Sequence, residues 1–399
     1  MPFVLEKGFH EDRLVPEVVA EQDTFIDIRR RIHANPELGA DVADTATLVA
    51  GLLRDWGYDV HTGIGGHGVV GRLKRGGGAR AIGIRADMDA LPIVETTDLP
   101  YASRVPGRMH ACGHDGHTAI LLAAAKHLAR HASFDGTLNL IFQPDEENLS
   151  GARRMIEDGL FERFPCDAVY ALHNAPGVPV GQFVVKEGSV TAASDVATVT
   201  LKGVGGHGAM PELTRDPIVA ASAIVMALQT IVSRNLAARD VGVVSVGGIQ
   251  AGATHNVIPE RAQLLLNMRS TTPEVRERIE TRVREIVASQ AQTFGVEASI
   301  DYTHLVPVVL NAEGPTALAR GVAAALVGDD HVLTDTRGVM GSEDFAWMAQ
   351  SVPGCYVMLG NGVGQWGGCM CHNPNYDFND RIISLGASYW VRLVETYLK

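Results

Sequence analysis

The stretch MHACGHDGH, residues 109–117, places a cysteine, an aspartate and three histidines within nine residues. The thiolate of Cys112 and the imidazole of His114 are good ligands for divalent transition metals. A structural zinc site needs four nitrogen or sulfur ligands, commonly from paired Cys-x-x-Cys units, and the sequence has no such unit. The stretch therefore favours a metal site that does chemistry. Asp115 could orient a ligand histidine, and His117 could simply begin a helix, so both roles stay open.

Three other segments carry metal-binding side chains, two of them at the end of an apolar run. IFQPDEENLSG leads into Asp145, Glu146 and Glu147, CDAVYALHN delivers His173, and CMCHNPNYDFND delivers His372. In open α/β sheets, sites form beyond the carboxyl ends of the strands. A solvated acidic turn and packed histidines are the alternatives, but the four segments together predict one metal site. In such a site one carboxylate binds metal while its neighbour accepts a proton.

These segments belong to alternating helices and strands, which is typical of an α/β sheet with helices on its faces. The apolar spacing predicts helices over residues 17–34, 45–57, 117–132 and 151–161, and strands over 80–87, 136–143 and 166–173. The same texture returns after residue 306, with helices over 314–328 and 385–398 and a strand over 354–361.

A different layout occupies the middle of the chain. Strands over 195–203, 241–249, 261–270 and 296–304 alternate with two helices, of which the second has Thr272 as N-cap and Pro273 at its first position. This strand-helix-strand-strand-helix-strand order is the ferredoxin-like arrangement. The chain is therefore predicted to be a catalytic domain of residues 1–190 and 305–399, interrupted by an inserted domain of residues 191–304.

Composition limits the classes of partner. The 399 residues carry a formal net charge of −12 and are 46% hydrophobic and 20% charged. We expect a folded protein that binds neither nucleic acid nor membrane, because no basic stripe and no membrane-length apolar run stand out. The N-terminus lacks the pattern of a secretory signal, and five scattered cysteines read as reduced thiols, so a cytoplasmic location is expected. A carboxylate substrate would need a local cation.

The chain resembles the dinuclear-metal N-acyl-amino-acid amidohydrolases, in the branch of the aminoacylase and carboxypeptidase metallopeptidases that contains hippurate hydrolase and the auxin-conjugate hydrolases. The resemblance rests on ordered motifs between about residues 29 and 380, namely RRRIHANPELG, GIRADMDALPI, MHACGHDGHTA, FQPDEE, ALHN, KGVGGHGAMP, HNVIPERA, GSEDFA and HNPNYDFND. It implies a zinc-peptidase-like catalytic domain with a mixed sheet and helices on both faces. It also implies that the inserted domain is a dimerisation or lid domain, in a homodimer or possibly a tetramer.

The resemblance also implies roles for single residues. Cys112 would bridge two divalent ions (zinc, manganese, cobalt or nickel), with His114 and His173 on one ion and Glu147 and His372 on the other. Glu146 would be the general base. His207 would stabilise the oxyanion in the partner subunit's site, and Asn256 and Arg269 would hold the substrate's carboxyl end. Asp87 and Asp89 match an acidic motif near the metals, without an assigned role.

The expected reaction is hydrolysis of the amide of an N-acyl-L-amino acid, such as a hippurate-like or N-acetyl compound. A dipeptidase, a carboxypeptidase or an N-acetyl-diaminopimelate deacetylase on the same scaffold is the first alternative. A metal-stabilised binding protein without activity is a remote one. The chain departs from the family pattern at Asp145, where alanine is usual, in NLSG, where a glycine-rich run is usual, and at Gly208. Asp145 could favour a cationic substrate group or face solvent.

Overall fold

A computed structural model describes residues 11–335, 338–364 and 367–399. The chain forms two compact units: residues 1–188, 309–337 and 343–399, and residues 189–308 with 338–342. The predicted insertion spans 191–304. The second unit of the structure covers 189–308 and also includes the short return segment 338–342. Two short strands, β7 (Gly188–Ser189) and β14 (Leu310–Asn311), lie next in sequence to the main crossings between the units.

The first unit contains an eight-stranded mixed sheet in the order β1-β2-β4-β3-β5-β16-β6-β15. Strands β3, β4, β5 and β16 run parallel, whereas β1 and β2 are joined antiparallel at one side. The bounds are β1 Asp59–Ile64, β2 Gly68–Arg75, β3 Ala81–Asp87, β4 Gly136–Gln143, β5 Ala168–Pro176, β6 Phe183–Val184, β15 Val332–Leu333 and β16 Gly354–Gly362.

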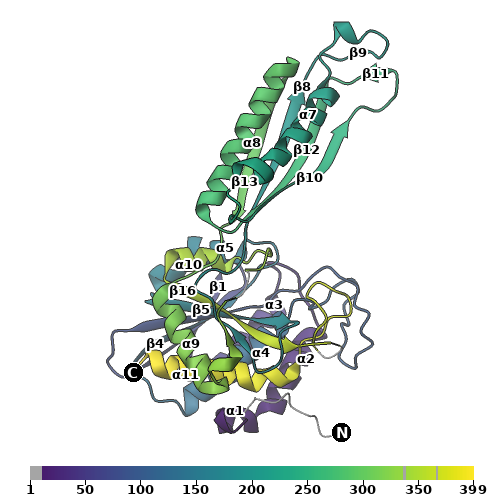
Figure 1. The fold of residues 1–399 in the computed structure, drawn as a ribbon. Coiled ribbons are helices and arrows are strands. Elements are labelled where there is room, and N and C mark those ends of the chain that lie inside the picture. Colours follow the sequence, from purple (N-terminus) through teal and green to yellow (C-terminus); the bar gives the residue numbers. More distant parts are fainter. Residues whose placement is uncertain (1–10, 336–337, 365–366) are drawn as a thin grey trace. The chain divides into compact units, whose positions relative to one another are not determined.

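Helices cover both faces of this sheet. Figure 1 shows α4, α9 and α11 on one side and α5 and α10 on the other. The bounds are α1 Pro16–Ala20, α2 Gln22–His33, α3 Ala43–Asp55, α4 His114–Arg130, α5 Gly151–Glu157, α6 Leu160–Arg163, α9 Glu313–Val327, α10 Phe345–Ser351 and α11 Ile383–Tyr397. Helix α4 is apolar on nearly all sides and is buried in the core against α11, where Ile120 and Trp390 are almost fully buried. The predicted mixed α/β class is confirmed.

The second unit has a four-stranded antiparallel sheet in the order β10-β12-β8-β13. Its elements are β8 Ala193–Lys202, β9 Gly206–His207, α7 Pro217–Thr230, β10 Gly242–Ala251, β11 Val257–Ile258, β12 Arg261–Ser270, α8 Pro273–Phe294 and β13 Glu297–Val306. Helices α7 and α8 lie on one face of the sheet (Figure 1), and β9 pairs with β11 in a separate small sheet. This order is the predicted ferredoxin-like arrangement. Thr272 caps α8 as expected, because its hydroxyl accepts the N–H of Val275.

The segment Pro217–Asn235, α7 with the short turn that extends it, is long and apolar enough to cross a membrane by length and composition alone. The expectation of no such run is therefore wrong by this measure. Small and branched apolar residues occur on every side of the helix, so its mean hydropathy is high. One side packs on the sheet of the second unit through Ala220, Ile224 and Leu228.

Candidate metal centre

The start of α4 places Cys112 and His114. Gly113 is the N-cap with φ of +100°, a conformation that side chains rarely adopt. A Cβ at Gly113 would lie 2.3 Å from Nδ2 of Asn174 and 2.6 Å from the hydroxyl of Tyr376, so only glycine fits. The chain therefore turns sharply, and the cysteine and the histidine on either side of the glycine both point to the site.

His173 faces Cys112 from the carboxyl end of β5. Its Nδ1 lies 2.7 Å from the backbone carbonyl of Asn174, which can only accept a hydrogen bond, so Nδ1 carries the proton. Its Nε2 therefore presents a lone pair, and this atom lies 3.4 Å from Sγ of Cys112. Burial, followed by the nearby His117, holds the pKa of His173 well below its usual range, which keeps the ring neutral and able to bind metal.

His114 is oriented in the same way. Its Nδ1 donates to the backbone carbonyl of Asp89 at 2.8 Å, so Nε2 is the ring nitrogen that faces the site and could bind a metal once deprotonated. That Nε2 is fully buried, has no hydrogen-bond partner among the described residues, and lies 3.9 Å from Oε2 of Glu146 and from Oε1 of Glu147. A buried nitrogen aimed at two carboxylates without a bond is a position that a cation would satisfy.

Glu146 and Glu147 follow β4 in a tight turn. Burial raises the pKa of Glu147 to about 7 against the opposing charge of His114. Burial also raises the pKa of Glu146 well above its usual range, with the carboxylates of Glu343 and Glu147 adding to the effect. Oε1 of Glu147 has no hydrogen-bond partner in the described chain. Crowded acids of this kind need a positive charge between them.

His372 completes the set from the loop before α11. Its backbone has φ of +65°, and its N–H donates to the carbonyl of Ala111 at 2.7 Å, which ties the loop to the residue before Cys112. Its Nε2 lies 3.4 Å from Oε2 of Glu147. The side chain is 55% exposed, so this edge of the site opens to solvent.

The ligand atoms form two groups, Cys112 with His114 and His173, and Cys112 with Glu147 and His372. Within each group the atoms lie within 4.8 Å of one another. Cys112 belongs to both groups, and the donors are a thiol, imidazoles and a carboxylate, so the residues fit two divalent transition metals that share a sulfur ligand. Glu146 lies beside them, in a third group with His114 and Glu147.

Asp87, His114 and His117 are also close enough to hold a metal, but both ring nitrogens of His117 already make hydrogen bonds within the protein. Its Nδ1 bonds Oδ1 of Asp87 at 2.6 Å, and its Nε2 accepts the backbone N–H of Asn174 at 3.0 Å. With both ring nitrogens occupied by the protein, His117 is a structural residue of the site.

Asp115 does not orient a ligand histidine. Its carboxylate binds the buried Arg29 at 2.7 Å and Nδ1 of His33 at 2.8 Å. Asp89 has that orienting role instead, because it binds His114 and its Oδ2 accepts the backbone N–H of Glu147 at 3.1 Å. The family resemblance implied that Asp89 lies near the metals but gave no sign of which residue it contacts.

Buried charged residues around Arg85 lie next to the predicted ligands, and the sequence alone predicts no role for them. Arg85 in β3 donates to Asp87 at 2.7 Å and to Glu343 at 2.9 Å, and lies 3.2 Å from Asp344. Glu146, Glu343 and Asp344 each have a carboxylate oxygen that lies within 4.8 Å of a carboxylate oxygen of the other two. The sequence signal that could have indicated this cluster is an arginine inside an apolar strand, together with the two acidic residues of GSEDFA.

The Asp145 carboxylate does not face solvent, and it is already hydrogen-bonded within the protein. It is buried with φ of +61°, and its carboxylate accepts hydrogen bonds from the side chains of Asn148 and Ser150. Arg154 lies 3.2 Å from it. Asp145 therefore builds the turn that presents the two glutamates after β4.

The other predicted residues lie in the second unit. His207 in β9 is paired with Val257, next to Asn256, and all three side chains are exposed. Nδ1 of His207 accepts the N–H of Ala209 at 3.0 Å, which leaves Nε2 as the proton-bearing atom. Arg269 in β12 is half-buried, and its Nη1 donates to the hydroxyl of Ser342 in the return segment.

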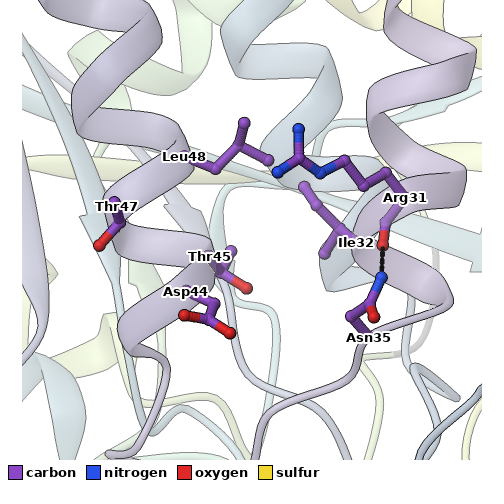
Figure 2. A pocket seen from close by; sticks show the side chains of 7 residues that line it. All are labelled: Arg31, Ile32, Asn35, Asp44, Thr45, Thr47 and Leu48. Carbon is purple, nitrogen blue, oxygen red and sulfur yellow. Dashed lines mark hydrogen bonds between the residues drawn. The ribbon is translucent and has the colours of Figure 1, made fainter.

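A hollow of about 430 Å³ lies between α2 and α3 in the first unit (Figure 2). It is lined by Arg31, Ile32, Asn35, Asp44, Thr45, Thr47 and Leu48. Asn35 closes one side by donating to the backbone carbonyl of Arg31 at 2.8 Å. None of the predicted ligands lines it, so the chemistry described above lies elsewhere.

Comparison with known proteins decides the family. Residues 83–396 match the model of a protein family that is described as Peptidase family M20/M25/M40. The chain belongs to this family. It is 44% identical to hippurate hydrolase of Campylobacter jejuni over 97% of the chain and 100% of that protein. It is 35% identical to N-acetylcysteine deacetylase of Bacillus subtilis over 94% of the chain and 97% of that protein.

A solved M20 structure from Bacillus subtilis, described as a dinuclear metal binding peptidase, matches with a TM-score of 0.83 and 32% identity. The match covers 95% of this chain and 99% of that one. The predicted family and the prediction of an amidohydrolase are therefore confirmed for this M20 protein. The roles given to single residues stay predictions.

Proposed function

We propose that this M20 amidohydrolase cleaves the amide bond of N-acyl-L-amino acids, releasing a carboxylic acid and a free amino acid. The observation that carries the proposal is the pair of donor groups sharing Cys112, with the buried carboxylate of Glu146 beside them. Two divalent ions are the cofactors, drawn from zinc, manganese, cobalt and nickel. Mixed nitrogen, oxygen and sulfur ligands suit several of these metals.

The protein's own groups divide the work. Bound divalent ions supply Lewis acidity, which polarises the amide carbonyl and makes water a stronger acid. Glu146 is the general base that accepts the proton of the attacking water and returns it to the leaving nitrogen. Its burial suits this role, because a carboxylate with a raised pKa holds a proton better than one in water.

The carboxyl end of the substrate meets Arg269 and Asn256. The chain carries a formal net charge of −12, so attraction of an anionic substrate depends on a local cation. Arg269 is half-buried and held by Ser342, which limits its motion. His207 donates to the oxyanion that forms at the carbonyl, and it does so in the site of the partner subunit.

The second unit forms a homodimer in this proposal. Support comes from the outer side of α7, where Val219 is 50% and Met226 is 71% exposed, and from β10, an edge strand on which Ile249 is 55% exposed. An apolar helix face beside an unpaired strand edge favours association with a second copy. We also propose a cytoplasmic location, supported by the five cysteines, all of which are free.

A substrate panel tests the proposal. Chelator-stripped protein is reloaded separately with manganese, zinc and cobalt, and is offered N-benzoylglycine, N-acetyl amino acids and dipeptides with a free α-amine. We expect metal-dependent cleavage of one or more acyl compounds and little cleavage of the dipeptides. Cleavage confined to dipeptides would overturn the acylase assignment in favour of the dipeptidase alternative.

A further inference from the structure

Three segments that carry predicted metal ligands meet at one buried side chain, Asn174, which follows His173 in β5. Its Nδ2 lies 2.6 Å from the backbone carbonyl of Cys112, and its Oδ1 lies 2.7 Å from the hydroxyl of Tyr376. Tyr376 is on the loop of His372 and is fully buried. One amide therefore connects the cysteine segment, the end of β5 and the histidine loop.

The direction of each hydrogen bond is fixed by chemistry. The carbonyl of Cys112 can only accept, so the nitrogen of the Asn174 amide must face it and the oxygen must face Tyr376. That oxygen can only accept, so the hydroxyl of Tyr376 donates its single proton to it. The Asn174 amide has one orientation in this setting, and rotation by half a turn would break both bonds.

The packing leaves no slack around these bonds. A side chain at Gly113 would collide with both Nδ2 of Asn174 and the hydroxyl of Tyr376. The Tyr376 backbone N–H donates to the carbonyl of Asn373 at 2.9 Å, which closes a turn directly after His372. A shift of Tyr376 therefore moves the His372 turn relative to Cys112.

We propose that Asn174 and Tyr376 are a positioning pair that sets the spacing between Cys112 and His372. The inference rests on the proposed function, because it concerns the ion that Cys112, Glu147 and His372 would hold. The Tyr376 hydroxyl is tied to the Cys112 backbone only through Asn174, whereas Asn174 bonds that backbone directly. Loss of the hydroxyl should weaken one ion selectively, and loss of the amide should weaken both.

The test is calorimetric titration of metal-free protein with Zn²⁺, comparing wild type with Tyr376→Phe and Asn174→Leu. Tyr389→Phe is the matched control, because the Tyr389 hydroxyl is also buried but has no hydrogen-bond partner among the described residues. For Tyr376→Phe we expect one of two ions to bind about 10- to 100-fold more weakly, the usual effect of losing a group that orients a metal ligand. The other ion should change little, and Tyr389→Phe should match wild type.

A purely structural role would look different. It would weaken both ions equally in Tyr376→Phe and lower the unfolding temperature of the metal-free protein, and that outcome would overturn the proposal. Wild-type affinity for both ions in Tyr376→Phe would also overturn it. Selective loss in Tyr376→Phe with loss of both ions in Asn174→Leu would support it. A wild-type protein that binds fewer than two ions would instead contradict the proposed function, so the two failures are distinguishable.

Discussion

Sγ of Cys112 and Nε2 of His173 face each other across 3.4 Å, although they come from the start of α4 and the end of β5. The imidazole offers a lone pair and not a proton, because its other nitrogen is bound to a backbone carbonyl. In the metal-free chain the thiol of Cys112 donates its proton to this lone pair, and a divalent ion bound to both atoms would replace that proton.

Replacing Cys112 by serine should therefore remove metal from both groups, since this residue belongs to each. The loss of affinity should exceed the roughly 10- to 100-fold that follows from losing a residue that merely orients a ligand. Metal per chain, measured by elemental analysis after dialysis, checks the expectation. Cys166→Ser, outside the site, is the control and should keep both ions. Two ions retained in Cys112→Ser would rule out a shared sulfur ligand.

Replacing Arg269 by methionine should raise KM for N-acyl amino acids with a smaller change in kcat, because a charge-assisted bond to the substrate's carboxylate is lost. A contribution of about 1.5 to 3 kcal/mol corresponds to roughly a 10- to 150-fold loss in kcat/KM. The matched comparison is a substrate in which a carboxamide replaces the α-carboxylate. Wild type should cleave it with a low kcat/KM, and the variant should have nearly the same kcat/KM on it. Equal losses on both substrates would mean that Arg269 has a structural role.

The stability of the metal-free protein should fall as pH rises above about 6.5, and His33 should contribute to this fall together with the buried glutamates of the site. Burial, and then Arg29, would lower the pKa of His33, but hydrogen bonds to Asp115 and Glu95 outweigh them and raise it. A folded pKa above the unfolded value stabilises the protein at low pH, and this contribution is lost as pH rises through the folded pKa. The contribution of His33 to the slope should reach up to about 1.4 kcal/mol per pH unit.

Urea unfolding from about pH 6 to about pH 9 measures this slope. His33→Gln should flatten it, whereas His67→Gln, at an exposed position between β1 and β2, should not. An unchanged slope in His33→Gln would assign the pH dependence to another group.

Asp145→Ala should destabilise the protein by about 1 to 3 kcal/mol, because the turn loses the buried carboxylate that accepts hydrogen bonds from the side chains of Asn148 and Ser150. Asp145→Asn keeps an acceptor and tolerates positive φ, so it should cost less. Urea unfolding gives the stabilities, and the acyl panel gives the specificity. A loss of activity on cationic substrates with unchanged stability would mean that Asp145 contacts substrate.

Much of this fold and site can be predicted from the sequence, because the signals are local. His173 and Glu147 follow apolar strands, and parallel strands bring such ends to one edge of a sheet. The ferredoxin-like unit is recognisable from the order of its strands and from the Thr272 cap of α8. The division of the ligands into two groups comes from the family resemblance, and it stays a prediction.

The supporting contacts could not be predicted, because they join segments that are far apart in the chain. Nothing local to Asn174 indicates a bond to Tyr376, and nothing local to Asp115 selects Arg29 over a ligand histidine. The return of residues 338–342 to the second unit is likewise a tertiary event. Pattern and residue type indicate candidate ligands, the family resemblance assigns their roles as predictions, and packing decides which polar residues orient them.

The most direct test of Glu146 as the general base of a metal-dependent hydrolysis is the turnover of an N-acyl amino acid by metal-loaded Glu146→Gln, with bound metal counted in the same sample. Glu157→Gln, an exposed position on α5, serves as the control. We expect two ions per chain, a kcat lower by about 10²- to 10⁴-fold and a KM close to wild type, because the glutamine cannot accept the proton. Full turnover by Glu146→Gln with both ions bound would contradict the account.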